Sequence, residues 1–192
     1  SIGRNAFFGC KSLTSIIIPD SVTSIEGYVF FRCSSLSDIT IPDSVTRIGG
    51  SAFSGCTSLT SIVIPDRVTS IGAFAFSDCT SLTTIEVGAG NMNFTGINGV
   101  LFNAEKTVLV AYPAGKVGAN YTIHNGVTSI GRSAFCMSKS LTSVKIPDSV
   151  TSIGRSAFNT CTSLTSITIP DSVTSIGSNA FKWCESLTAV TF

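Results

Sequence analysis

Charged side chains are scarce in this sequence of 192 residues. Asp, Glu, Lys and Arg together make up 12% of the chain, and the formal net charge is +1. Proteins that bind nucleic acid or anionic membranes carry a surplus of Lys and Arg on one face. Apolar residues make up 43% of the chain, but no apolar run reaches the roughly 18 residues of a membrane-spanning helix. We therefore expect no nucleic-acid partner and no membrane insertion.

Metal-binding and cofactor motifs are also missing. His124 is the only histidine, and none of the seven cysteines is paired in a C-x-x-C spacing. A structural zinc site needs four closely spaced Cys or His ligands. We expect neither a metal nor a cofactor.

The chain instead contains one short pattern many times over. Isoleucine recurs at a fixed step, phenylalanine follows each isoleucine after five residues, and leucine follows that phenylalanine after six. One full unit, residues 48–70, reads IGGSAFSGCTSLTSIVIPDRVTS. A fixed period of this length indicates a solenoid, in which each unit buries its apolar face against its neighbours. The isoleucines are Ile2, Ile25, Ile48, Ile71, Ile130, Ile153 and Ile176.

The residues of one unit predict its local structure. Residues 59–64, LTSIVI, are rich in β-branched side chains and alternate as a short strand does. Pro65 and Asp66 favour a turn, and residues 68–71 form a second short extended piece. Residues 49–56, GGSAFSGC, are expected to form one helical or 3-10 turn that points Ala52 and Phe53 inward. Stacking at about 4.8 Å would place each Ile, Phe and Leu over its own copy.

One region departs from the period. The interval from Ile71 to Ile130 exceeds two units by thirteen positions. Within residues 88–125, two strand-like runs at 99–102 and 107–113 are joined by the turn sequence NAEK, which predicts a β-hairpin. We expect a local bulge or outgrowth on the solenoid and not a second domain. His124 stands where other units have proline and is expected to fill a turn.

The consensus LxxIxIPxxVxxIGxxAFxxCxx resembles the BspA-type, or treponemal, class of leucine-rich repeats over residues 1–87 and 126–192. The resemblance implies a curved leucine-rich-repeat β-solenoid, right-handed, belonging to a secreted or surface-anchored protein associated with adhesion. We expect one domain over residues 1–192, with an irregular unit at 88–125. The opening SIGRNAFFGC lies inside a repeat and has no signal-peptide pattern, so a longer natural protein is expected.

The cysteines follow the repeat with one exception. Six are in phase and are interpreted as a ladder of small buried thiols: Cys10, Cys33, Cys56, Cys79, Cys161 and Cys184. In the unit after Ile130 the in-phase place is taken by Ser138, and Cys136 lies two residues earlier. We expect Cys136 to be exposed and reactive. A catalytic pair of Cys136 with His124 is the alternative, but no oxyanion hole or pocket is recognisable beside them, so no enzyme is expected.

Two kinds of surface residue suggest binding. In-phase columns of Ser and Thr, such as Thr23, Thr46 and Thr69, either satisfy backbone groups at the corners of the coils or form a regular hydroxyl array for ice or a crystalline polysaccharide. The second kind is aromatic and cationic residues that interrupt the uniform turn segments, where Tyr, Trp, Phe and Arg are typical of binding hot spots. Neutral drift is the alternative explanation for them. These residues are Arg4, Tyr28, Phe31, Arg32, Phe74, Arg132, Arg155, Lys182 and Trp183.

The residues favour a non-catalytic binding module, and the resemblance implies a location outside the cell or on its surface. It would present a curved solenoid to a protein partner, such as an extracellular-matrix or host-surface protein. The alternative is a structural spacer that assembles end to end, because neither end of the sequence shows the polar cap that solenoids need.

Overall fold

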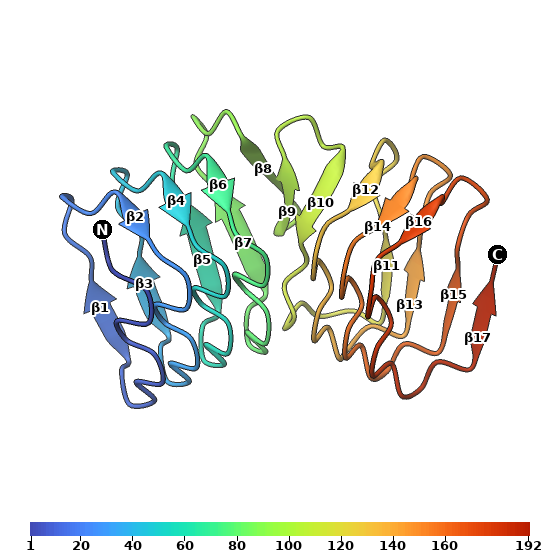
Figure 1. The fold of residues 1–192 in the computed structure, drawn as a ribbon, viewed down its shortest axis with the longest axis horizontal. Coiled ribbons are helices and arrows are strands. Elements are labelled where there is room, and N and C mark those ends of the chain that lie inside the picture. Colours follow the sequence, from blue (N-terminus) through green and yellow to red (C-terminus); the bar gives the residue numbers. More distant parts are fainter.

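The computed structural model describes residues 1–192, and the chain forms a β-solenoid with two strand-bearing faces (Figure 1). Each regular coil has one strand on each face. The first face carries β1 (Ser15–Ile17), β3 (Asp38–Thr40), β5 (Ser61–Ile64), β7 (Thr84–Val87), β11 (Asn120–Thr122), β13 (Ser143–Lys145), β15 (Ser166–Thr168) and β17 (Ala189–Thr191). The second face carries β2 (Ser24–Ile25), β4 (Arg47–Ile48), β6 (Ser70–Ile71), β10 (Val108–Ala111), β12 (Ser129–Ile130), β14 (Ser152–Ile153) and β16 (Ser175–Ile176).

Successive coils pair in parallel at the register of the sequence repeat. Ile62 lies beside Ile85 between β5 and β7, and Ile130 lies beside Ile153 between β12 and β14. The phenylalanines stack in the same way, with ring centroids 5.4 Å apart for Phe30 and Phe53. The predicted solenoid with in-register apolar ladders is therefore confirmed.

The turn that follows each isoleucine differs from the expected helical or 3-10 turn. In residues 49–56 three hydrogen bonds close successive tight turns: Ala52 N–H donates to Gly49 O, Ser54 N–H to Ser51 O, and Cys56 N–H to Phe53 O. Ser51 and Gly55 have φ of 55° and 79°, and these left-handed residues interrupt any right-handed helical run. The remaining peptide groups point along the solenoid axis and bond to the next coil.

The threonine column has a structural role. The Oγ1 atoms of Thr46, Thr69, Thr151 and Thr174 each donate to the threonine carbonyl of the preceding coil at 3.1–3.2 Å. This bears out the interpretation that hydroxyls satisfy backbone groups at the corners. Because these four hydroxyl protons are already used, they are not free donors for an ice or polysaccharide surface.

The irregular region is built into the wall of the solenoid. The predicted hairpin forms between β9 (Val100–Asn103) and β10, which are antiparallel, and an additional strand β8 (Phe94–Ile97) pairs with β9. β10 also pairs in parallel with β12, so one six-stranded sheet runs in the order β16-β14-β12-β10-β9-β8. Of the two expected forms, bulge or outgrowth, the structure does not show an outgrowth: the hairpin replaces part of a coil, and the pairing of β10 with β9 shifts register between Leu109 and Ala111.

Strand β9 separates two hydrophobic cores. The first core contains 24 buried residues, from Ile18 to Leu101, and the second contains 21, from Val100 to Ala180. Side chains of a strand alternate between its two faces, so Leu101 packs into the first core while Val100 and Phe102 pack into the second. No helix in the structure is both long and apolar enough to cross a bilayer.

The close stacking of coils predicts the effect of adding one methyl group at a repeated glycine. A Cβ on Gly154 would lie 2.7 Å from the carbonyl carbon of Gly131 in the preceding coil, whereas a Cβ on Gly3, at the same place in the repeat, would meet nothing within 4 Å. Gly154→Ala should lower the free energy of unfolding by about 1–3 kcal/mol, as overpacking does. Gly3→Ala should change it by less than about 0.5 kcal/mol. Urea titration of both variants measures this, and equal losses would contradict the stacking.

Candidate functional site

All the predicted contact residues lie along one edge of the solenoid. We call it the turn edge; it consists of the turn segments 3–10, 26–33, 49–56, 72–79, 131–138, 154–161 and 177–184. Figure 1 shows these turns at the lower side, opposite the Pro-Asp turns that follow the strands of the first face. The structure divides the predicted residues into a group in the first two coils, a group at the middle of the solenoid and a pair in the last coil.

The group in the first two coils is the most compact. The rings of Phe8 and Phe31 stack with centroids 4.9 Å apart, and Tyr28 meets Phe31 edge-on at 5.6 Å. The Arg4 guanidinium lies 5.0 Å from the centre of the Tyr28 ring, and that of Arg32 lies 5.3 Å from the centre of the Phe31 ring. Both distances are within the range of cation–π attraction. These five residues form what we call the aromatic–arginine cluster.

Phe8 was not among the predicted residues. Its side chain is 51% exposed, and it occupies the same place in the repeat as Phe31, one unit later. A comparison of the two units, place by place, could have found it.

Several of these side chains sit on left-handed backbone. Tyr28, Arg32, Phe74 and Trp183 have φ between 57° and 62°, and the place of Arg32 is taken by Gly55 in the next coil. A residue with a Cβ in this region costs roughly 1–2 kcal/mol, whereas glycine adopts it readily. The same conformation recurs in other coils, as at Asn5, Ser51 and Ser133, so it belongs to the repeated turn and not to these four residues alone.

The remaining cationic residues are spread along the edge. Arg132 and Arg155 are exposed at the same place in adjacent coils, which are joined by the hydrogen bond from Ser133 N–H to Arg155 O. In the last coil the Lys182 ammonium lies 5.5 Å from the centre of the Trp183 ring, and Trp183 is 60% exposed. The structure does not bring this pair together with the aromatic–arginine cluster.

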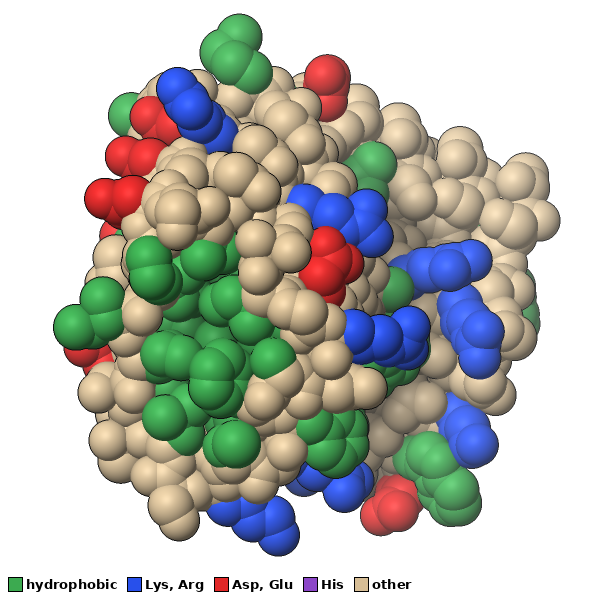
Figure 2. Space-filling view, turned by 60° about the vertical axis from the view of Figure 1, so that its left-hand side comes forward, with side chains coloured by type: hydrophobic (Ala, Val, Ile, Leu, Met, Phe, Trp, Pro, Cys, Tyr) green, Lys and Arg blue, Asp and Glu red, His purple; other side chains and the backbone are tan.

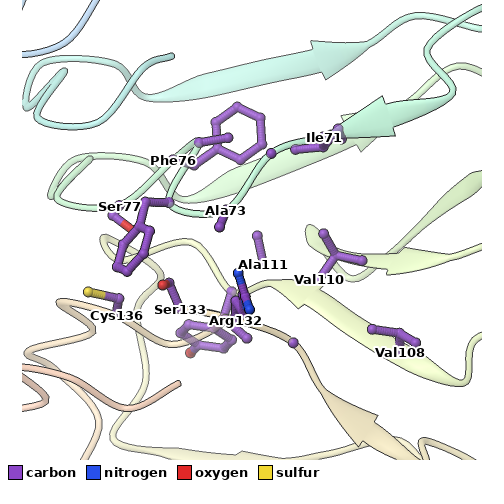
Figure 3. A pocket seen from close by; sticks show the side chains of 16 residues that line it. Ile71, Ala73, Phe76, Ser77, Val108, Val110, Ala111, Arg132, Ser133 and Cys136 are labelled. Atoms are coloured by element: carbon purple, nitrogen blue, oxygen red, sulfur yellow. The ribbon is translucent and has the colours of Figure 1, made fainter. Parts of the chain in front are cut away.

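A cleft of about 240 Å³ opens in the middle of the turn edge (Figure 3). We call it the central cleft; its walls are residues 71–77 and the turn around Arg132, Ser133 and Cys136, and its floor includes Val108 and residues 110–112. Phe74 and Arg132, both predicted contact residues, line it. The cleft was not predicted, and its only signal in the sequence is the thirteen extra positions of the irregular unit.

The expectation of an exposed Cys136 is wrong, because its side chain is 9% exposed at the wall of the central cleft. Burial raises the pKa of the Cys136 thiol, and a hydrogen bond with Ser77 partly offsets this rise. Cys136 lies on the turn edge, whereas His124 lies in the turn after β11 at the opposite edge. The structure therefore does not assemble the Cys136–His124 pair.

The other cysteines form the predicted ladder of buried thiols, except that Cys10 and Cys184 in the terminal coils are not fully buried. The Sγ atoms of Cys33, Cys56, Cys79 and Cys161 lie 3.0–3.2 Å from the carbonyl oxygen of the ladder phenylalanine in the preceding coil and donate to it. Burial raises the pKa of Cys79 to about 12. Cys10, in the first coil, is exposed.

Comparisons with known proteins agree with this architecture. The family model described as a BspA type leucine-rich repeat region matches residues 1–113 and 118–192 in six copies. A leucine-rich repeat protein from Eubacterium ventriosum is 32% identical, with a TM-score of 0.88 over all of this chain and 57% of its own. A leucine-rich cell surface protein from Faecalibacterium prausnitzii is also 32% identical, with a TM-score of 0.64 over 97% of this chain and 62% of its own.

A protein of lower sequence identity has the same fold. The leucine-rich repeat protein of T. pallidum is 27% identical, with a TM-score of 0.56 over 91% of this chain and 78% of its own. This chain thus spans less than two thirds of the length of the first two relatives. A search of curated proteins found no match.

The burial of the thiols predicts their order of alkylation. Because the thiolate is the reactive species and burial disfavours it, iodoacetamide at pH 8 should modify Cys10 first in the native protein. Cys136 should react as slowly as Cys56 and Cys79, and all seven cysteines should react in denaturant. Peptide mapping by mass spectrometry follows each site. Alkylation of Cys136 as fast as Cys10 would show that its side chain is open to solvent.

Proposed function

Since the chain belongs to the BspA-type leucine-rich repeat family, we propose that it is a non-catalytic protein-binding and adhesion module. It presents the turn edge of a single rigid solenoid to a partner protein outside the cell or on its surface. An extracellular-matrix or host-surface protein fits this role. The cell-surface description of the F. prausnitzii relative supports the location.

The aromatic–arginine cluster is the observation that carries the proposal. Tyr, Phe and Arg side chains dominate the binding energy of protein interfaces, and they act best when held in a group. Here Phe31 packs against Phe8, Tyr28 and Arg32, while Phe8 and Arg32 remain exposed. Because the cluster is held by turns bonded to neighbouring coils, little conformational freedom is lost when a partner binds.

Removal of the two central rings tests this role. The double variant Tyr28→Ala/Phe31→Ala should bind immobilised fibronectin or fibrinogen at least about 30-fold more weakly than the unchanged chain, as expected for the loss of a hot spot of about 2 kcal/mol. Surface plasmon resonance measures the affinity, and circular dichroism verifies that the variant is folded.

Ile17→Ala is the matched control. Ile17 is 94% exposed in β1 on the first face, so its loss removes an apolar surface side chain away from the turn edge. Its affinity should equal that of the unchanged chain. If Ile17→Ala loses binding and the double variant retains it, the contact lies on the strand face and the proposed site is wrong.

A second candidate function is a self-assembling spacer, in which residues 1–192 would stack end to end through the apolar surface of the first coil. Ile2, Phe7 and Leu13 are only partly buried, whereas their copies in the next coil, Ile25, Phe30 and Leu36, are fully buried. Figure 2 shows hydrophobic side chains gathered on the side of the molecule that contains this coil. Stacking against the last coil of a second copy would bury them.

This second function predicts association that depends on protein concentration. Sedimentation velocity should show dimers and longer species, and Leu13→Lys should abolish them by placing a charge in the stacked surface. A chain that stays monomeric over the whole concentration range rejects end-to-end assembly and leaves partner binding as the function.

A further inference from the structure

The coil that contains β10 has a shorter turn than its neighbours. Leu109 lies beside Ile130 in the paired strands β10 and β12, and Tyr112 N–H bonds to the next coil as Phe135 N–H does. Tyr112 therefore occupies the place of a ladder phenylalanine. It follows Leu109 by three residues, whereas Phe135 follows Ile130 by five. The turn that leads to Tyr112 is thus two residues shorter than a regular one.

The same turn also ends early. After Tyr112 the chain leaves the turn edge at Pro113, and Gly115 N–H bonds to Leu82 O. A Cβ on Gly115 would lie 2.5 Å from Thr80 O, so glycine permits this close detour. The central cleft opens beside the shortened turn.

The sheet of the second face is interrupted at this place. β6 is the last strand of one sheet, in the order β2-β4-β6, whereas β10 belongs to the six-stranded sheet. Ile71 in β6 is only half-buried, although Ile25 and Ile48, its copies in the two preceding coils, are fully buried. Val108 and Val110 in β10 are also half-buried, and they line the cleft together with Ile71. The cleft therefore has an apolar end that the chain leaves partly uncovered.

Polar groups without partners also line the cleft. Phe74 N–H has no acceptor in the protein, whereas the N–H group at this place in five other turn segments donates to the next coil. Ser133 is 8% exposed, and its hydroxyl has no partner either. In Figure 3, Arg132 and Ser133 lie toward one end of the cleft, and Ile71 and Val108 lie toward the other. Because buried hydroxyl groups nearly always have a hydrogen-bond partner, Ser133 points to a bound acceptor.

Arg132 determines the charge of the cleft. It is exposed, and it is the only charged residue in the lining. The carbonyls of Arg132 and Cys136 also lack partners, but they carry no full charge. Asp78 lies outside the lining, where Lys139 and Arg32 favour its charged form. The charge that the cleft attracts is therefore negative.

A carboxylate attached to an apolar body matches both ends of the cleft. A carboxylate accepts two parallel hydrogen bonds from a guanidinium, whereas a phosphate brings a further charge that one arginine leaves unbalanced. The volume of about 240 Å³ exceeds the roughly 150 Å³ that holds benzene and is below the roughly 300–1,000 Å³ of drug-sized ligands. We propose that the central cleft binds a small carboxylic acid with a single ring or a short hydrocarbon chain.

In this complex the carboxylate lies at the polar end. It accepts from the Arg132 guanidinium and Phe74 N–H, and from the Ser133 hydroxyl, whose proton turns toward it. The ring or chain lies against Ile71 and Val110. It covers the apolar surface that the shortened turn leaves open, and the burial of this surface favours binding.

This binding activity goes beyond the proposed protein contact. The lining of the cleft shares no residue with the aromatic–arginine cluster. The acids should therefore bind equally well to the Tyr28→Ala/Phe31→Ala variant. The acid site and the protein contact hold or fail independently of each other.

Two acids and their amides test the proposal. Phenylacetate and hexanoate, titrated into the ¹⁵N-labelled chain at pH 7, should shift the amide signal of Phe74 in a saturable way, with dissociation constants below about 1 mM. Phenylacetamide and hexanamide keep the apolar body but lack the charge, so they should bind at least about tenfold more weakly. Acetate and inorganic phosphate lack the apolar body and should also bind at least about tenfold more weakly.

Two matched pairs of variants locate the site. Arg132→Gln should weaken acid binding at least about tenfold, whereas Arg155→Gln, at the same place in the next coil but outside the lining, should leave it unchanged. Ser133→Ala should weaken binding at least about threefold. Ser138→Ala also removes a buried hydroxyl without a partner, but one outside the lining, and should leave binding unchanged. Circular dichroism verifies that each variant is folded.

Three outcomes would overturn the proposal. The first is the absence of saturable shifts with both acids, and the second is equal binding of the acids and their amides. The third is an equal loss in Arg132→Gln and Arg155→Gln, which would show general electrostatic attraction and no site. If Ser133→Ala does not fold, the arginine pair decides, because both arginines are exposed.

Discussion

Backbone hydrogen bonding between successive coils is the constraint on which this molecule depends. Peptide groups of the regular turn segments and of the paired strands lie along the solenoid axis and bond to their counterparts in the adjacent coil. Because a buried peptide group without a partner is costly, this bonding fixes the register to the residue. The apolar ladders, the thiol ladder and the glycines at close approaches follow from that register.

The same constraint explains where function can reside. Between the strands, the apolar ladders are buried and the hydroxyls of Thr46, Thr69 and Thr151 donate to the preceding coil. The turn edge is different. Its positions with positive φ carry side chains of many kinds, from Asn5 and Ser51 to Tyr28 and Trp183, and the hydrogen-bonded turns hold these side chains in fixed positions. The aromatic–arginine cluster and the central cleft both lie there. One arises from unusual side chains on regular turns, and the other arises beside a shortened turn.

The sequence predicted the ladders and the hairpin well, because both follow from local patterns that repeat. It did not predict the tight turns of residues 49–56, since Ser51 adopts its left-handed conformation to bond with Ala73 in the next coil. Strand β8 was missed because FTGI contains a glycine, which weakens a strand signal; Gly96 is there because a Cβ would lie 3.3 Å from Ile85 O.

The wrong expectation for Cys136 and the missed cleft have one cause. Both depend on the detour at Pro113 and Gly115, which shortens one turn segment after Tyr112 and places Cys136 opposite Ser77. No periodicity within a single chain encodes such a detour. The residues predicted to contact a partner all lie on the turn edge, but only the folded register shows which of them touch one another.

Residue-resolved amide hydrogen exchange tests the central claim, which is that inter-coil bonds hold the regular turn segments and are missing at the segment 72–79. Exchange protection reports the local stability of each hydrogen-bonded amide. The account predicts slow exchange at Phe30, Phe53, Phe135 and Phe158, whose N–H groups bond to the next coil, and fast exchange at Phe76. Equal protection at all five phenylalanines would show that the coils are bonded without interruption and would contradict the account.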